Sequence, residues 1–149
     1  MKNLLVVLAS TAAVGLASSA FAADASAEHK SNVELKKNGG YEATTAAERT
    51  TAAGTKHEAK EKVDVEVDSK GMHKESVKAE SSTDPKGLMN AKKDTTKATY
   101  EDKSNGGYKQ TKTDKHTDAA GTDVKTTTTT DVDVDANKNA TATVKTEKT

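Results

Sequence analysis

The sequence contains no cysteine and no tryptophan, and it has one proline, one phenylalanine and three tyrosines. Without cysteine the chain cannot build a disulfide framework, nor can it carry a lipid on a cleavage-site cysteine. Large aliphatic side chains are scarce as well, since residues 23–149 include nine valines, two leucines and no isoleucine. These make up about 9% of that segment, whereas disorder is usual below ~20%. Because ordering each residue costs about 1–2 kcal/mol of backbone entropy, a conventional globular core is not available.

The charges nearly cancel. The chain has 23 Lys and Arg residues against 23 Asp and Glu residues, and without Lys2 the segment 23–149 has a formal net charge of −1. A protein that attracts nucleic acid or anionic lipid through its overall field needs a large positive charge. We therefore expect no nucleic-acid partner.

The N-terminus has the pattern of a cleaved signal peptide. Lys2 precedes an apolar stretch that starts at Leu4, and Ala20-Phe21-Ala22 places small residues where a signal peptidase reads. We predict a signal peptide over 1–22 with cleavage after Ala22, and a periplasmic or secreted product. A membrane anchor is the alternative, but the strongly apolar part is too short for a span of ~20 residues. In general character the chain resembles small alanine-rich, signal-bearing envelope proteins of Gram-negative bacteria, a resemblance that rests mainly on residues 1–22 and implies no function.

The remaining chain contains an internal duplication of one sequence unit. Equivalent residues of the two copies differ by a constant number of positions, the number that separates Asn38 from Asn105. We call this number the repeat offset. Residues 34–82 and 101–149 share 19 identities in 49 positions without a gap. The identities gather in ordered blocks, which random drift of a Thr- and Lys-rich sequence does not produce. The main blocks are Asn38–Tyr41 with Asn105–Tyr108, Ala52–Thr55 with Ala119–Thr122, and Asp64–Asp68 with Asp131–Asp135.

The pattern between the glycine-containing turns predicts long β-strands. Val63, Val65 and Val67 alternate with charged residues, as in a half-buried strand. The predicted strands are 32–37, 41–50, 55–68, 72–82, 99–104, 108–117, 122–135 and 139–149.

We therefore predict an all-β antiparallel meander of two tandem four-stranded units, 32–82 and 99–149. The units either pack their Val/Ala faces together or continue as one long, thin sheet. The alternative is a largely disordered low-complexity chain. Residues 23–31 are expected to be disordered in either case.

The segment 83–98 is predicted to be a connector. Asp84-Pro85 resembles the start of a short helix, with Asp as N-cap and Pro at the first helical position. Leu88 and Met89 could then close one end of the sheet, whereas a flexible connector is the alternative.

Two turns have specific expected conformations. Asn38-Gly39 favours the positive φ angles of a type I′ hairpin turn, with Gly40 as a bulge. In Asp135–Asn139 we expect asparagine to replace the glycine of the first copy, because asparagine adopts a left-handed conformation most readily after glycine.

Candidate metal sites are weak in this sequence. Asp131, Asp133 and Asp135 alternate like the first ligands of an EF-hand loop, but its sixth and twelfth positions hold Ala136 and Ala142 instead of Gly and Glu. The four histidines are not repeated between the copies, and zinc normally takes three or four protein ligands. They are His29, His57, His73 and His116. We predict no metal residues and no cofactor.

Threonines in the second copy raise a further possibility, an ordered hydroxyl array of the kind that binds ice. This requires one flat face to hold Thr126, Thr128, Thr130, Thr141 and Thr143. Charged residues in the first copy interrupt such an array, so we do not expect a repeated ice-binding face.

Catalytic patterns are missing as well. The serines lack a nucleophile-elbow pattern, and Gly39-Gly40 and Gly106-Gly107 lack the strand-turn-helix context of a phosphate loop. We predict no enzyme activity and no catalytic or cofactor-binding residues. The predicted function is that of a secreted or periplasmic structural or interaction protein. The sequence does not identify its partner, and an envelope polymer and a further copy of the chain are the two candidates. The alternative is a weak cation- or polysaccharide-binding module of the cell envelope.

Overall fold

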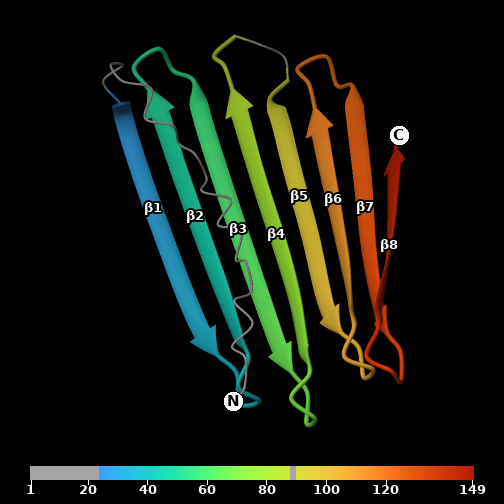
Figure 1. Cartoon of the computed structure of the whole chain (residues 1–149). Coiled ribbons are helices and arrows are strands. Elements are labelled where there is room, and N and C mark those ends of the chain that lie inside the picture. Colours follow the sequence, from blue (N-terminus) through green and yellow to red (C-terminus); the bar gives the residue numbers. More distant parts are fainter. Residues whose placement is uncertain (1–23, 88–89) are drawn as a thin grey trace.

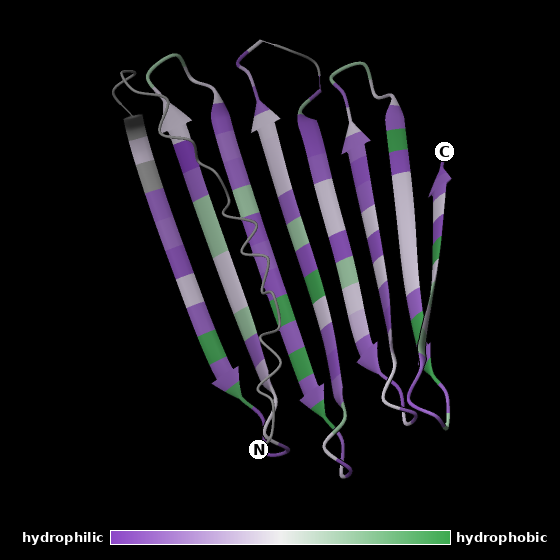
Figure 2. Cartoon of the chain, in the orientation of Figure 1, coloured by the Kyte–Doolittle hydropathy of each residue, from purple (hydrophilic) through white to green (hydrophobic). Residues whose placement is uncertain are grey.

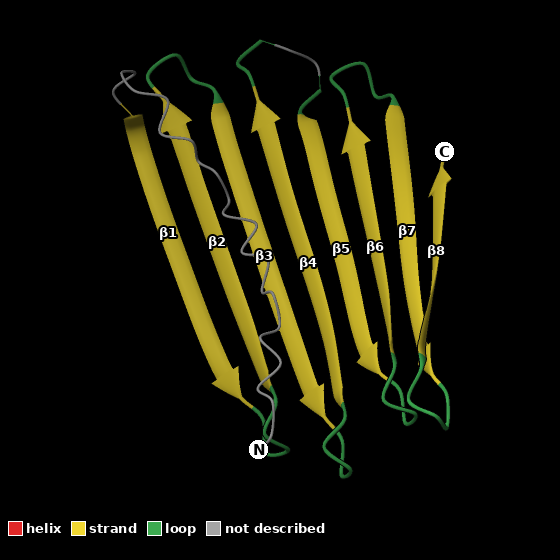
Figure 3. Cartoon of the chain, viewed as in Figure 1, coloured by secondary structure: helices red, strands yellow, loops and turns green. Residues whose placement is uncertain are grey.

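The computed structural model describes residues 24–87 and 90–149. The predicted signal peptide 1–22 lies outside the described residues, as do Leu88 and Met89 of the connector. The described residues form eight strands joined by turns (Figure 3). They include no helix long and apolar enough to cross a membrane.

The strands form one antiparallel sheet whose order follows the sequence from β1 to β8, which confirms the predicted all-β meander (Figure 1). Each strand has 9 to 12 residues. Their bounds are β1 (Asp24–Leu35), β2 (Tyr41–Thr51), β3 (Lys56–Val67), β4 (His73–Asp84), β5 (Lys92–Asp102), β6 (Tyr108–Thr117), β7 (Asp123–Val134) and β8 (Ala140–Lys148). The sheet is a single layer, whereas most domains pack a second layer against one face.

Two expectations about unpaired segments were wrong. Residues 24–31 were expected to be disordered but belong to β1, which pairs with β2 from Ser26 to Leu35. The backbone of β2 orders this segment, although the segment has almost no apolar side chains of its own. The connector 83–98 is also shorter than predicted, because β4 runs to Asp84 and β5 begins at Lys92. Asp84 therefore ends a strand, and no helix is present among the described residues on either side of 88–89.

The hydrogen-bonded ladder continues from β4 to β5, with pairs from Lys74↔Glu101 to Thr83↔Lys92. The described chain is thus one long sheet, the second of the two arrangements that we expected, and the structure does not divide it into separate four-stranded units. The strand plan does repeat along the chain. β7 follows β3 by the repeat offset at both ends, and β6 begins one repeat offset after the start of β2.

Six hairpins share one turn geometry. The N–H of the first loop residue donates to the carbonyl of the fifth, and the N–H of the fourth donates back to the first. The fourth residue has a positive φ, as in a three-residue connection built on a type I turn and a glycine bulge. The type I′ turn expected at Asn38-Gly39 was therefore wrong, because the left-handed residue is Gly39 (φ 85°) and not Asn38. The six loops are 36–40, 51–55, 68–72, 103–107, 118–122 and 135–139.

The last of these loops has no glycine at its left-handed position. Lys138 has a φ of 65°, and it is the only non-glycine residue with a positive φ among the described residues. It occupies the place that Gly71 holds in the first copy, so the expectation that an asparagine would fill this place was wrong. The geometry of the loop fixes which position must be left-handed, and that position holds a lysine.

Aspartates brace three of the loops. The carboxylates of Asp68, Asp118 and Asp135 each accept backbone N–H groups from two and four residues further along. These hydrogen bonds favour the charged carboxylate. The backbone N–H of Met72 is the main cause that lowers the pKa of Asp68.

Candidate functional site

The register of the ladder places all nine valines of β1 to β8 on one side of the sheet, which we call the valine face. Side chains alternate between the two faces of a strand, and directly paired residues share a face. The three tyrosines and four histidines also lie on this face. Its valines are Val33, Val63, Val65, Val67, Val77, Val124, Val132, Val134 and Val144.

Burial on the valine face is confined to a thin central stripe. Ala59 is 3% exposed, and the valines of β3 are half-buried. At the two edges of the sheet Leu35 is 83% exposed and Val144 is 62% exposed. Figure 2 shows by hydropathy that the apolar residues form short bands, which alternate with polar residues along the strands. The described sheet therefore has a stripe of partly covered valines and no enclosed core.

Glu75 lies in the middle of this stripe, between Val65 on β3 and Tyr100 on β5. It is 6% exposed, and among the described residues it forms no hydrogen bond or ion pair. Burial raises the pKa of its carboxyl, because a poorly solvated carboxylate is less stable than the neutral acid. Sequence reasoning missed this residue, since nothing in the local pattern of β4 shows which side chains flank it.

Two aromatic rings cover part of the valine face beside Glu75. Tyr100 and Tyr108 stack with their ring centroids 5.3 Å apart. The hydroxyl of Tyr100 donates to Asp102 at 2.9 Å. Burial, together with this hydrogen bond, raises the pKa of Tyr100 to about 12. The Tyr100 hydroxyl therefore keeps its proton at neutral pH, and the two stacked rings form an aromatic element of the valine face.

The opposite side, which we call the lysine face, is almost entirely polar. Ala46 is the only apolar side chain that the described strands place on it between residues 28 and 147; the other positions hold Lys, Glu, Asp, Thr, Ser and Asn. Lys62, Lys78 and Lys97 stand directly beside one another on β3, β4 and β5. A broad open hollow on this face is lined by four lysines, Lys78, Lys97, Lys115 and Lys125, with threonines and two acidic residues between them.

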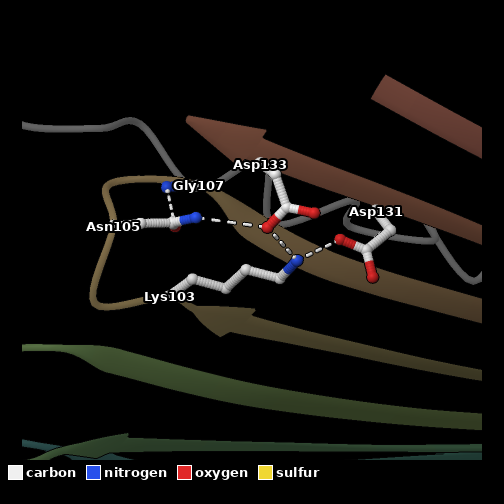
Figure 4. A network of polar contacts seen from close by, with 5 residues as sticks. All are labelled: Lys103, Asn105, Gly107, Asp131 and Asp133. Atoms are coloured by element: carbon white, nitrogen blue, oxygen red, sulfur yellow. Dashed lines mark hydrogen bonds and ion pairs between the residues drawn. The ribbon is translucent and has the colours of Figure 1, made fainter. Parts of the chain in front are cut away.

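A lysine at the start of a hairpin loop links two acidic side chains of a neighbouring strand (Figure 4). Lys103 Nζ contacts Asp131 and lies 2.8 Å from Oδ1 of Asp133. Asn105 donates to the same oxygen of Asp133 at 3.2 Å and accepts the backbone N–H of Gly107 at 3.0 Å. These contacts, that of Asp131 first, raise the pKa of Lys103.

The first half of the chain has the same cluster. Lys36 Nζ lies 2.5 Å from Oδ1 of Asp64 and 3.7 Å from Oε1 of Glu66, and Asn38 accepts the N–H of Gly40. Every member is separated from its counterpart by the repeat offset. Sequence reasoning also missed this lysine, although the signal was present: Lys36 and Lys103 are identical and lie two positions before the repeated Asn-Gly-Gly.

The acidic run that suggested calcium has other contacts. Asp131 and Asp133 accept from Lys103, and Asp135 braces its own loop through Asn137 and Asn139. Within the described ranges no three His, Cys, Asp or Glu side chains are grouped so that they could hold a metal ion. The acidic oxygens of this run are therefore engaged in structural contacts.

The histidines share the valine face but lie on four strands, and the structure does not bring them together. Nδ1 of His57 lies 3.2 Å from the hydroxyl of Thr83, and Nδ1 of His116 lies 2.6 Å from Asp94. His73 contributes its backbone N–H to Asp102. Each of these three histidines therefore contacts a different polar side chain on an adjacent strand.

The hydroxyl array considered for ice binding would need its five threonines on one face, and the register of β7 and β8 does not place them so. Thr126, Thr128 and Thr130 lie on the valine face with Val144, whereas Thr141 and Thr143 pair with Asp133 and Asp131 on the lysine face. The five-residue loop 135–139 fixes this register: even-numbered residues of β7 face even-numbered residues of β8. These two strands therefore divide their threonines between the two faces.

No protein-family model, curated protein or solved structure matches this chain. The features of this chain that bear on function are therefore the two faces of the sheet, its edges and the paired clusters.

Proposed function

We propose that the protein is a non-enzymatic structural or interaction protein of the periplasm or the cell exterior, and that its working part is the surface of the sheet. The observation that carries this proposal is the single layer: both broad faces are accessible, and Ala59 and Glu75 are the only buried hydrophobic, polar or charged side chains among the described residues. An enzyme needs an enclosed, preorganised site that shifts the properties of its groups. Glu75 is the one buried carboxyl on the described faces. It forms no ion pair among the described residues, and these residues hold no group of three metal-ligating side chains.

Location is the first test of this proposal. The full chain should be produced with its own N-terminus in a Gram-negative host, and its intact mass measured after separation of the periplasm and cytosol. We expect a product of residues 23–149 outside the cytosol. A protein that retains Met1 and stays in the cytosol would overturn the proposal.

The polysaccharide alternative is favoured by one specific observation, the row Lys62–Lys78–Lys97 beside the open hollow. Like charges directly opposite one another destabilise a sheet. Glu42 and Glu80 lie within 2.9 Å of Lys62 and Lys78 and offset part of this repulsion. The row fits an acidic polysaccharide such as a polyuronate, whose repeating carboxylates could follow the lysines across the strands.

A polyuronate and a neutral dextran of the same length test this alternative by calorimetry. We expect binding of the polyuronate alone, and its loss in the triple variant Lys62→Gln, Lys78→Gln, Lys97→Gln. The matched control replaces three lysines outside the row, Lys30, Lys109 and Lys145, by glutamine. Equal loss in both variants would indicate an unspecific charge effect and count against a polysaccharide site.

A further inference from the structure

The two edge strands expose most of the large hydrophobic side chains that the described residues leave open to solvent. Val33 (65% exposed) and Leu35 (83%) belong to β1, and Val144 (62%) belongs to β8; only Val124, at 39%, lies elsewhere. β1 and β8 stand at opposite ends of the sheet (Figure 1). Edge strands also present a row of unpaired N–H and C=O groups, which makes them templates for another strand.

The chain contains a template for how these two edges fit together. β5 ends one repeat offset after the end of β1, and β8 begins one repeat offset after the start of β4. β4 and β5 are paired with each other inside the sheet. The backbone groups with which β4 and β5 bind one another are therefore the groups that β8 and β1 turn outward.

We propose that copies of this chain assemble edge to edge, with β8 of one copy pairing antiparallel with β1 of the next as β4 pairs with β5. This inference deepens the proposed structural function and rests on it. It names the partner, a second copy of this chain, and it fixes the register. The β4–β5 pair Glu75↔Tyr100 becomes Ala142 opposite Val33, and Lys74↔Glu101 becomes Thr141 opposite Glu34.

This register brings the exposed hydrophobic side chains together on the valine face. Ala142 already pairs with Val132, and Ala140 pairs with Val134. Adding β1 of the next copy places Val33 beside Ala142 and Leu35 beside Ala140. Val144 then lies diagonal to Val33, within reach of side-chain contact. The small alanines leave room for the two larger residues, so the stripe of valines continues across the junction.

The charges on the lysine face suit the same register. Glu28 and Lys30 of β1 form an ion pair at 2.7 Å, and β8 carries Lys145 and Glu147 two positions apart. At the junction Lys145 stands diagonal to Glu28, and Glu147 stands diagonal to Lys30. Lys145 opposite Lys30 repeats the like pair that β4 and β5 tolerate at Lys78↔Lys97. Glu147 opposite Glu28 is an added like pair, since β4 and β5 have Glu80↔Thr95 there, and the two diagonal pairs of opposite charge offset it.

Such a contact joins different surfaces of the two copies, and a head-to-tail contact gives open ribbons or rings. Since neighbouring strands are about 4.8 Å apart, each copy of eight strands would lengthen a ribbon by about 38 Å. The valine and lysine faces would each continue along the whole ribbon. A short polar chain would thus form a long two-faced surface.

Cysteine cross-linking tests both the contact and its register, because the native chain has no cysteine. Opposed residues in an antiparallel ladder lie about 4.5–5.5 Å apart at Cα, which suits a disulfide. The full chain with Val33→Cys and Ala142→Cys should give, on mild oxidation, a ladder of dimers, trimers and longer species in non-reducing gels. The matched control, Asn32→Cys with Ala142→Cys, places its thiols on opposite faces, so its ladder should be weaker by on the order of tenfold.

Other results would overturn the proposal. A ladder of equal strength in the control would show that the register is wrong. Dimers without longer species, formed as readily by Val33→Cys alone, would show that like edges meet instead. In the unsubstituted chain, outward-facing amides of β1 and β8 should exchange hydrogen more slowly as protein concentration rises. If the chain is folded and exported but shows neither slower hydrogen exchange nor a cross-linked ladder, the assembly is contradicted and the proposed extracytoplasmic function is not. Retention of the chain in the cytosol would contradict that function instead.

Discussion

The first half of the sheet, β1 to β4, and the second half, β5 to β8, share a strand plan but differ in the side chains on it. Both halves keep the lysine-centred cluster, at Lys36 and at Lys103. Both also keep a glycine that lies against a neighbouring carbonyl, Gly40 and Gly107. They differ at the centre of the valine face, where Glu75 in β4 corresponds to Ala142 in β8.

This difference shows which positions specify the fold. The residues that the halves share set turn geometry and hold one strand against the next. Most residues that vary are exposed, where a substitution changes little. The two buried side chains vary as well, because Ala59 and Glu75 correspond to Thr126 and Ala142. The sheet is therefore specified by its turns and its ladder more than by a core, and each prediction below tests one part of that view.

Separating the halves should have the largest effect. A chain of residues 23–82 keeps β1 to β3 and most of β4 but loses β5, whose Tyr100 lies beside Glu75. The remaining stripe of half-buried valines is too thin to offset the entropy of ordering four strands. We expect the β-sheet signal in circular dichroism to be lost from 23–82 and retained in 23–149. A cooperative thermal melt of 23–82 would contradict this expectation and would make the first half an independent unit.

The shared glycine beside each cluster should show the next largest effect. A β-carbon on Gly107 would overlap the backbone carbonyl of Val132, and one on Gly40 would overlap that of Val65. We expect Gly107→Ala to lower the free energy of unfolding by at least about 2 kcal/mol, because backbone must move to relieve the overlap.

Gly106→Ala is the matched control for this substitution. Gly106 has a φ of 86° but open space around its Cα, so alanine there should cost only about 1 kcal/mol. Denaturant melts of the two variants compare them directly. A larger loss from Gly106→Ala would mean that φ, and not the close approach to Val132, is the constraint on this loop.

The sequence predicted most strands because turns and alternation repeat at fixed intervals. The predicted strand 108–117 coincides with β6, and 55–68 exceeds β3 by one residue at each end. β1 was missed over residues 24–31, because its order depends on pairing with β2 and not on its own composition. The burial of Glu75 was missed for a related reason: register across three strands places it between Val65 and Tyr100. The sheet was thus predictable from local signals, whereas the contents of its faces depended on non-local pairing.

Glu75 makes the first half less stable than it could be at neutral pH. Its pKa is raised in the folded protein, so the native state binds its proton more tightly than the unfolded state. Its favourable contribution is complete below the unfolded pKa of about 4.3 and is lost as pH rises through the folded pKa. Glu75→Gln should therefore raise the free energy of unfolding at pH 7 by about 1 kcal/mol.

The pH dependence of that gain identifies its cause. The gain should shrink toward zero as pH falls below about 4, because both side chains are then neutral. Glu80→Gln is the control; Glu80 lies on the solvated lysine face, 2.9 Å from Lys78, and the change should stay within about 0.5 kcal/mol. Urea melts of both variants across this pH range give the comparison. A gain from Glu75→Gln that does not vary with pH would show that shape, and not charge, accounts for it.

The smallest expected effect concerns the loops between the last two strands of each half. Gly71 and Lys138 occupy the same left-handed position, with φ of 79° and 65°. A residue with a β-carbon is strained there by roughly 1–2 kcal/mol. Glycine avoids this strain but loses more backbone entropy on folding, which offsets part of its advantage. We expect Lys138→Gly to raise the free energy of unfolding by about 0.5–1 kcal/mol, and Gly71→Lys to lower it by a similar amount. Asn137→Gly is the matched control, because Asn137 does not have a positive φ. This substitution should lower the free energy of unfolding by a few tenths of a kcal/mol, because glycine adds entropy to the unfolded chain. If Lys138→Gly and Asn137→Gly shift the denaturant midpoint alike, the loop does not confine its strain to one residue, and the two halves differ less than their backbones indicate.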